Sequence, residues 1–310
     1  MLAVGSCFAE HVGRRLEESK LPVCLNPMGI LFNPASIAGC IERLITGEEM
    51  KGEDLLHHHG LWLSLHHHGR YSHPDKQACL DAMNRDLRRG ADHLGSAALL
   101  VLTFGTAFAF EDVESGNVVA NCHRLPAERF RRRLLAPGDI VDRLAPLLHR
   151  LSGMNSGLRI LLTVSPVRHL RDHPTENQVS KSTLILAAHD LVTRFDHVDY
   201  FPAYEIMMDD LRDYRFYDRD RAHPSEEAVD YILEKFVSAH LDEEARELMD
   251  RMRSLQKALA HRPLYPSSDA FQRFVKIQLE TVETLQSRYP ELDLVKERDH
   301  FRDLLAPPYS

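Results

Sequence analysis

The segment Leu2-Ala3-Val4-Gly5-Ser6-Cys7-Phe8-Ala9 carries the strongest structural signal in the chain. Its first three residues are apolar, and after Ser6 the apolar residues Phe8, Val12 and Leu16 recur at the spacing of one helix face. The segment therefore predicts a strand that passes into a helix at Ser6. Backbone N–H groups and the helix dipole favour negative charge at such a junction. A serine placed there is half of an acyl-transfer site.

The other half is predicted by Asp220-Arg221-Ala222-His223-Pro224. Proline favours the first position of a helix, so we expect His223 at a helix N-cap with its ring free to project. The Asp220 carboxylate, three residues earlier, can bond Nδ1–H of the imidazole. That bond leaves Nε2 to accept a proton from the serine.

Each half also has a plainer interpretation. Gly5-Ser6 can be an ordinary helix start in which the serine hydroxyl caps the backbone. Asp220 and His223 can be a surface pair, and Asp218 competes with Asp220 for the role of the acid.

The pattern along the chain predicts a mostly parallel, doubly wound α/β sheet, because strand-like and helix-like segments alternate. The predicted strands are Leu2–Val4, Pro22–Leu25, Ala97–Thr103, Arg159–Ser165 and Val198–Phe201. The predicted helices are one that begins at Asn33-Pro34 and stops at Gly47, Lys76–Arg89, Pro137–Leu151 and Ser180–Phe195. Ligands of such sheets bind beyond the carboxyl ends of the strands, where we expect Ser6, Gly29, Gly105 and Ser165.

The character of the sequence changes near residue 240. Two charged helices are predicted beyond it, over Glu243–Ala258 and Ala270–Gln286. We therefore expect a sheet domain over residues 1–240 and an α-helical extension over residues 241–310. The extension either packs on the sheet domain or serves as an oligomer contact, and the oligomeric state is left open.

Composition narrows the classes of partner and compartment. The 310 residues carry a net charge of −8, with no dense basic run beyond Arg129 and Arg131-Arg132-Arg133, so nucleic-acid binding is not expected. Five cysteines, an odd number without a Cys-x-x-Cys pair, favour a reducing compartment, and we expect a cytoplasmic protein. No segment has the length and apolarity of a membrane span or signal peptide, so no membrane partner is expected. The chain begins almost directly in its first strand, and a misplaced start would have removed any targeting segment.

The chain resembles the GSCFA family, whose name is spelled by Gly5-Ser6-Cys7-Phe8-Ala9. Stretches that fit the family follow in order along nearly the whole chain: Leu102–Ala107, Asn121–Arg124, Thr163–His169, Glu176–Gln178, Ser180-Lys181, Tyr200–Glu205, Leu211–Tyr217 and His223–Ser225. The family looks like a branch of the SGNH, or GDSL-like, hydrolases. The resemblance implies a three-layer α/β/α sandwich and ester hydrolysis as a class of reaction, with no particular substrate.

Residue by residue, the resemblance makes Ser6 the nucleophile, His223 the general base and Asp220 the orienting acid. It also implies an oxyanion hole built from the backbone N–H groups of Ser6 and Gly29. Relatives add an asparagine in a Gly-x-Asn after the third strand. This chain has Gly105-Thr106-Ala107 there, so that donor is missing.

Asn121 is a candidate replacement for the missing donor. Phe108–Val113 and Asn117–Asn121 flank Ser115-Gly116 in the pattern of a hairpin, which would pair Asn121 near Phe110 and return its amide to the sheet mouth. The alternative is that Asn121 only satisfies backbone groups in a loop.

Two further sets of polar residues have open interpretations. The triplets His57-His58-His59 and His66-His67-His68 suggest zinc ligands. No acidic or thiol pattern of fixed spacing accompanies them, so we favour a solvated insertion or a wall of the acyl pocket and assign no metal ligand. The set after the fourth strand either faces a substrate or ties down its own loop. Its members are Ser165, Arg168, His169, Asn177, Ser180 and Lys181.

Together these patterns predict a serine hydrolase that needs no cofactor. We expect it to act on a small-molecule, carbohydrate or lipid acyl ester or thioester, with Gly105, Ser165, Arg168, His169 and Asn177 lining the substrate site. The alternatives are a zinc-dependent hydrolase that uses the histidine-rich insertion and a non-catalytic ligand-binding relative.

Overall fold

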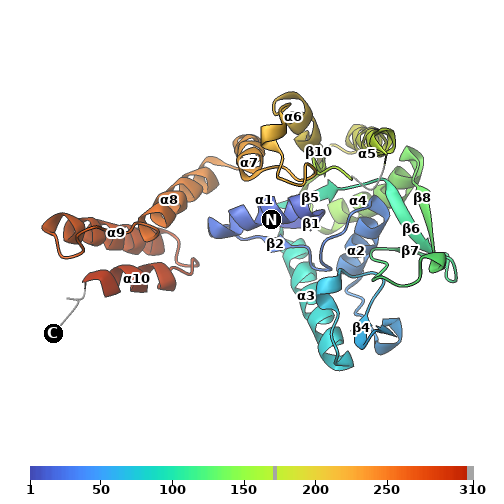
Figure 1. Ribbon diagram of the computed structural model, residues 1–310, viewed down its shortest axis with the longest axis horizontal. Helices are drawn as coiled ribbons and strands as arrows, with labels where there is room; N and C mark the ends of the chain where they lie inside the picture. Colours follow the sequence, from blue (N-terminus) through green and yellow to red (C-terminus); the bar gives the residue numbers. More distant parts are fainter. Residues whose placement is uncertain (170–172, 306–310) are drawn as a thin grey trace. The chain divides into compact units, whose positions relative to one another are not determined.

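The structure is a computed structural model that describes residues 1–169 and 173–305 (Figure 1). In these residues a five-stranded parallel sheet has the strand order β10-β9-β5-β1-β2. Its strands are β1 (Leu2–Gly5), β2 (Cys24–Leu25), β5 (Leu99–Phe104), β9 (Arg159–Val164) and β10 (Val198–Phe201). All five predicted strands are confirmed, with ends shifted by at most two residues.

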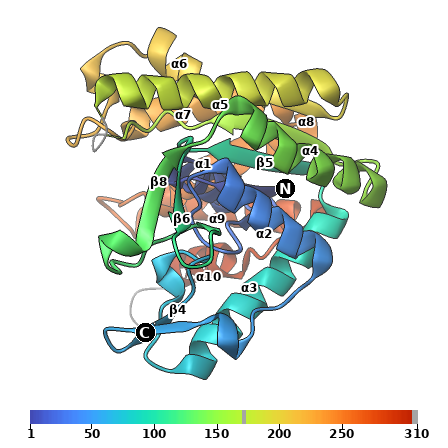
Figure 2. The ribbon, with the colours of Figure 1, turned by 90° about the vertical axis from the view of Figure 1, so that its right-hand side faces the viewer.

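Helices cover both faces of the sheet, so the predicted α/β/α sandwich is confirmed. One face carries α5, α4, α2 and α3, which lie side by side in that order (Figure 2). Side chains from α1 and α7 line the other face together with Ala3 and Val101. The helices are α1 (Cys7–Glu18), α2 (Pro34–Thr46), α3 (Lys76–Ser96), α4 (Pro137–Met154), α5 (Pro174–Arg194), α6 (Ala203–Asp209) and α7 (Glu226–His240).

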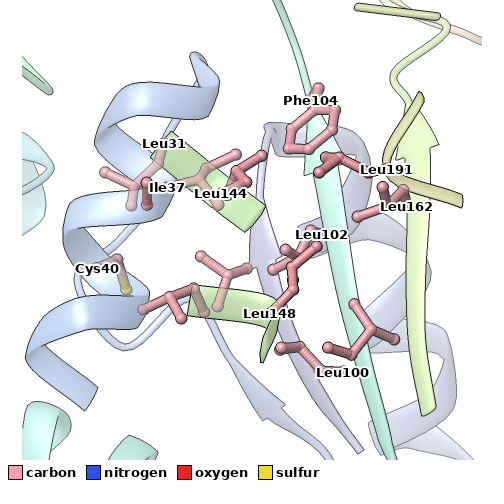
Figure 3. Close-up of a cluster of buried hydrophobic side chains, with 14 of the residues drawn as sticks. Leu31, Ile37, Cys40, Leu100, Leu102, Phe104, Leu144, Leu148, Leu162 and Leu191 are labelled. Carbon is pink, nitrogen blue, oxygen red and sulfur yellow. The ribbon is translucent and has the colours of Figure 1, made fainter. Parts of the chain in front are cut away.

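The main core lies between the sheet and the layer that contains α2 and α4. Figure 3 shows Leu100, Leu102 and Phe104 of β5 facing helix side chains that include Ile37 and Leu144. All five side chains are fully buried. Both faces of the strands are covered, which explains why β5 and β9 are continuous apolar runs.

Helix ends follow their capping residues where the sequence supplies them. Asn33 Oδ1 accepts the Ser36 N–H at 2.9 Å, and Gly47 ends α2 with φ of 66°, both as predicted. Helix α5 begins six residues before the predicted start at Ser180. Pro174 occupies its first turn, and the side chain of Glu176 accepts the N–H of His173 at 3.2 Å.

Smaller elements lie outside the central sheet. Strands β3 (Leu56–His58) and β4 (Leu61–Leu63) form a hairpin, and β6 (Phe108–Asp112) pairs antiparallel with β7 (Val118–Val119) and β8 (Phe130–Leu134). Short 3-10 helices span Gly52–Asp54, Gly69–Tyr71, Ala127–Arg129 and Tyr214–Phe216. The hairpin predicted around Ser115-Gly116 is confirmed, but its register is not. Val119, rather than Asn121, lies opposite Phe110.

The chain divides into two compact units. The first comprises Met1–Arg14 and Val23–Phe236, and the second comprises Arg15–Pro22 and Val237–Ser310. The second unit contains α8 (Glu243–Leu259), α9 (Asp269–Arg288) and α10 (Val295–Leu305) around buried Met252, Val275 and Phe301. Within it, Lys20 Nζ lies 2.9 Å from Glu297 Oε1, which ties the N-terminal segment to α10. Across the described residues, no helix is both long and apolar enough to cross a bilayer.

Candidate active site

Gly5 and Ser6 sit where β1 passes into α1. A Cβ on Gly5 would lie 2.2 Å from the Thr103 carbonyl oxygen, and its φ is 149°, so glycine is required at this close approach of two strands. Ser6 is 1% exposed, and its Oγ has no hydrogen-bond partner among the described residues. The hydroxyl therefore does not act as a helix cap, which removes the plainer interpretation of this serine.

His223 and Asp220 form the predicted pair. His223 Nδ1 lies 2.5 Å from Asp220 Oδ2, while Asp220 Oδ1 accepts the N–H groups of His223 at 3.0 Å and Ala222 at 2.8 Å. The bonds from the backbone and ring of His223 lower the pKa of Asp220 to about 2. The carboxylate is thus ionised and holds the imidazole by Nδ1, which leaves Nε2 for proton transfer.

The loop around His223 differs from the prediction at the helix start and bears on the choice between Asp218 and Asp220. His223 is not the N-cap of a helix, because α7 starts at Glu226 and the hydroxyl of Ser225 accepts the Ala228 N–H at 3.3 Å. Pro224 instead forms an isolated β-bridge with Tyr217. The competing acid Asp218 accepts the N–H of Arg219 at 2.7 Å, whereas the carboxylate that contacts the His223 ring is that of Asp220.

Ser6 and His223 lie at the same, carboxyl, edge of the sheet. Ser6 follows β1, and the His223 loop is tied to the loop after β9 by a 3.0 Å bond from the Arg168 N–H to the Ala222 carbonyl. The His223 side chain is 41% exposed, and in the described residues no hydrogen bond joins its ring to Ser6 Oγ. Catalytic hydrogen bonds often form fully only in a substrate complex, so this contact stays a prediction.

The backbone donors assigned to the oxyanion hole already have acceptors. The Ser6 N–H donates to the Thr103 carbonyl at 3.2 Å, because the β1–β5 ladder continues one residue beyond β1. The Gly29 N–H donates to the Asn26 carbonyl at 2.7 Å and closes a tight turn. Either group would have to share or release its bond in order to hold an oxyanion.

Asn121 bonds to backbone groups of its own loop after β7 and of the histidine-rich insertion. Its N–H donates to the Leu65 carbonyl at 3.2 Å, and its Oδ1 accepts the His123 N–H at 2.9 Å. These contacts correspond to the alternative in which Asn121 satisfies backbone groups in a loop. The register of β6 and β7 explains the difference, because Asn121 lies beyond the last paired residue.

Sequence reasoning missed Asn26, which follows β2. Its Oδ1 accepts the Gly5 N–H at 2.8 Å, its side chain is fully buried, and its Nδ2 has no partner among the described residues. Its backbone φ is 42°. The sequence shows an asparagine directly after a predicted strand, but nothing in the sequence reveals the unpaired amide.

Lys181 is buried at the same edge of the sheet. Its Nζ donates to the carbonyls of Gly105 and Ser165, each at 2.7 Å, and so joins the carboxyl ends of β5 and β9. Burial lowers its pKa to about 7, with a smaller opposing effect from Cys7.

The residues predicted to bind substrate are largely bonded to one another. His169 Nε2 lies 3.2 Å from the Gly105 carbonyl oxygen, and the His169 N–H donates to Asn177 Oδ1 at 3.1 Å. Ser165 Oγ accepts the Val167 N–H at 3.3 Å. The Arg168 guanidinium lies 4.1 Å from the centre of the Tyr217 ring. These contacts order the loop, and a role in binding substrate stays a prediction.

The histidine-rich insertion covers the loop after β2. The His68 N–H donates to the Met28 carbonyl at 3.0 Å, and Arg70 Nη2 donates to the Asn26 carbonyl at 2.7 Å. A Cβ on Gly29, whose φ is 80°, would lie 2.2 Å from His68 Cβ, so the insertion packs directly on this glycine.

Within the insertion, burial lowers the pKa of His67 to about 3, which keeps its ring neutral. Among the described residues, no group of three or more His, Cys, Asp or Glu side chains is arranged to hold a metal ion.

Comparison with known proteins gives two family matches. A model of the GSCFA family matches residues 1–236, and a model described as the GSCFA domain protein, C-terminal domain, matches residues 252–307. No curated protein matches the chain.

Proposed function

The chain belongs to the GSCFA family, and we propose that it is a serine hydrolase that cleaves an ester or thioester bond. The observation that carries the proposal is the 2.5 Å contact between Asp220 Oδ2 and His223 Nδ1, at the sheet edge where the buried Ser6 hydroxyl has no partner among the described residues. An oriented imidazole and an uncommitted serine at one sheet edge are the parts of an acyl-transfer site.

In the proposed mechanism, Ser6 Oγ attacks the carbonyl carbon of the ester while His223 Nε2 takes the hydroxyl proton. The carbonyl electrons move onto oxygen, and when the tetrahedral intermediate collapses the alcohol leaves with the proton from His223. A water molecule then gives a proton to Nε2 and attacks the acyl-serine, and as the acid is released His223 returns this proton to Ser6 Oγ. Asp220 holds the imidazole and stabilises its charged form throughout.

The substrate class and compartment belong to the same proposal. We propose that the substrate is a small-molecule, carbohydrate or lipid acyl ester, because the chain has no basic run suited to binding nucleic acid. The proposed mechanism needs no cofactor. All five cysteines lie in described segments and none forms a disulfide, which supports a reducing compartment such as the cytoplasm.

The test is turnover of a p-nitrophenyl acyl ester by Ser6→Ala, His223→Ala and the double variant. Each single change should remove most of kcat, and the double variant should lose little more, because the two groups act as a unit. Ser152→Ala and His149→Ala, on α4, are matched controls that should keep full activity. A folded Ser6→Ala protein with full activity would refute the mechanism.

A non-catalytic, ligand-binding function is the second candidate. One observation favours it: Ser6 is only 1% exposed, so in this structure its Oγ is not open to a substrate. The same assay separates the two candidates, since a binding protein would show no turnover that depends on Ser6 and His223.

A further inference from the structure

We propose that the side-chain amide of Asn26 is the hydrogen-bond donor that stabilises the oxyanion during attack by Ser6. The inference rests on the proposed serine mechanism. It is carried by two buried groups that lack partners among the described residues, the NH2 of Asn26 and the hydroxyl of Ser6.

The position of Asn26 is fixed from two sides. Its N–H donates to the Ala3 carbonyl at 2.9 Å, which continues the pairing of β2 with β1, and its Oδ1 accepts the Gly5 N–H at 2.8 Å. Oδ1 and Nδ2 belong to one planar amide. The bond to Gly5 therefore holds Nδ2 beside the Val4–Gly5 peptide, one residue before Ser6.

The unpaired side-chain NH2 of Asn26 destabilises the folded chain. A buried donor without an acceptor costs about 1–3 kcal/mol, and native structures keep few of them. Nδ2 of Asn26 and Oγ of Ser6 are both such atoms, and they belong to residues joined through Gly5. An oxyanion formed on attack by Oγ would give the amide its acceptor.

The other donors near Ser6 are less suited. The N–H groups of Ser6 and Gly29 already donate to main-chain carbonyls, and the Asn121 amide accepts the His123 N–H through Oδ1 while its Nδ2 lies beside Gly69. Asn26 is also rigid, because its carbonyl accepts both the Gly29 N–H and Arg70 Nη2, each at 2.7 Å. A fixed donor aimed at developing charge is the arrangement that lowers an acyl-transfer barrier.

In the proposed step, the Ser6 Oγ–carbon bond forms as the carbonyl π electrons move onto oxygen. The Ser6 proton passes to His223 Nε2. Asn26 donates Nδ2–H to the new oxyanion without losing its proton, and the bond weakens again when the alcohol leaves.

The test is Asn26→Asp, which keeps an oxygen to accept the Gly5 N–H and replaces the NH2 donor with a second oxygen. We expect kcat on a p-nitrophenyl ester to fall by about 10²–10³-fold with little change in KM, because the donor acts in the transition state. As pH falls, the activity of Asn26→Asp relative to wild type should rise, since a protonated carboxyl group donates a hydrogen bond. A purely structural role would not produce that pH profile.

Asn84→Asp is the matched control. Asn84 is also buried, with Oδ1 accepting the Met50 N–H at 2.8 Å and Nδ2 donating to the Met50 carbonyl at 3.0 Å, on α3 and away from Ser6. It should keep kcat. A folded Asn26→Asp protein within threefold of wild-type kcat overturns the inference, whereas an active Ser6→Ala protein overturns the serine mechanism itself.

A measurement on the unaltered chain covers the case in which Asn26→Asp does not fold. With ¹⁵N-labelled asparagine, the Nδ2 protons of Asn26 should shift downfield when phenylboronic acid forms a tetrahedral adduct with Ser6. An adduct that leaves those signals unchanged overturns the inference.

Discussion

Replacing Lys181 with methionine should change how the stability of the sheet-containing unit depends on pH. Lys181 is fully buried, and burial lowers its pKa from 10.5 to about 7. Between these values the unfolded chain binds a proton that the folded chain does not. The free energy of unfolding of the wild type therefore rises with pH across this window, and the contribution is lost as the pH falls toward 7.

The size of the effect follows from the shift. Each pH unit well inside the window changes the free energy of unfolding by about 1.4 kcal/mol. Between pH 7 and 9 the change is about 2 kcal/mol, because Lys181 is half-protonated in the folded chain at pH 7. Methionine fills similar volume but leaves the carbonyls of Gly105 and Ser165 without their 2.7 Å bonds from Nζ, at a cost of about 1–3 kcal/mol for each carbonyl left without a donor. That cost does not depend on pH. The slope of the stability difference against pH therefore measures the effect of burying the Lys181 ammonium alone.

The assay is urea unfolding at pH 7, 8 and 9, followed by tryptophan fluorescence. Trp62 is the single tryptophan of the chain and lies in the first unit, so the signal reports the unit that contains Lys181. The stability of the wild type minus that of Lys181→Met should increase steadily over this range. A stability difference that stays constant within about 0.5 kcal/mol between pH 7 and 9 would refute the reasoning, because a pKa shift of this size requires the difference to change with pH.

Three other predictions follow from the site. Gly5→Ala should destabilise the first unit by about 3 kcal/mol in the Trp62 assay, because the new Cβ would lie 2.2 Å from the Thr103 carbonyl oxygen. The control Gly39→Ala has open space around it on α2 and should stabilise the unit by about 0.5–1 kcal/mol. Asp220→Asn should lower kcat about 10⁴-fold by favouring the wrong imidazole tautomer, and a comparable loss in Asp218→Asn would reassign the acid. Prolonged dialysis against EDTA should leave kcat unchanged, whereas loss of activity together with stoichiometric zinc, both restored by zinc, would favour the histidine-rich insertion as the reaction centre.

The fold was largely predictable because its signals are local. Continuous apolar runs indicated β5 and β9, and Asn33-Pro34 with Gly47 indicated both ends of α2. The first turn of α5 escaped prediction because the exposed residues around Glu176 carry no apolar periodicity. The inclusion of Arg15–Pro22 in the second unit depends on contacts with residues more than 200 positions away, which no local pattern records.

The site was predictable where its residues are close in sequence. The pair of Asp220 and His223 spans one short loop, so its spacing indicated the contact that the structure contains. Hydrogen bonds between distant segments were not predictable. The bond that occupies the N–H of Ser6, and the contact of Gly5 with Asn26 Oδ1, depend on how β1, β2 and β5 pair in three dimensions.

Covalent labelling tests the central claim, that Ser6 is a nucleophile activated by His223. A fluorophosphonate probe, followed by peptide mass mapping, should modify Ser6 in the wild type, only slowly in His223→Ala, and not in Ser6→Ala. Burial raises the pKa of the adjacent Cys7 thiol, which keeps that neighbour protonated and a poor competitor. A label found on Cys7, or equal labelling of the wild type and Ser6→Ala, would contradict the account.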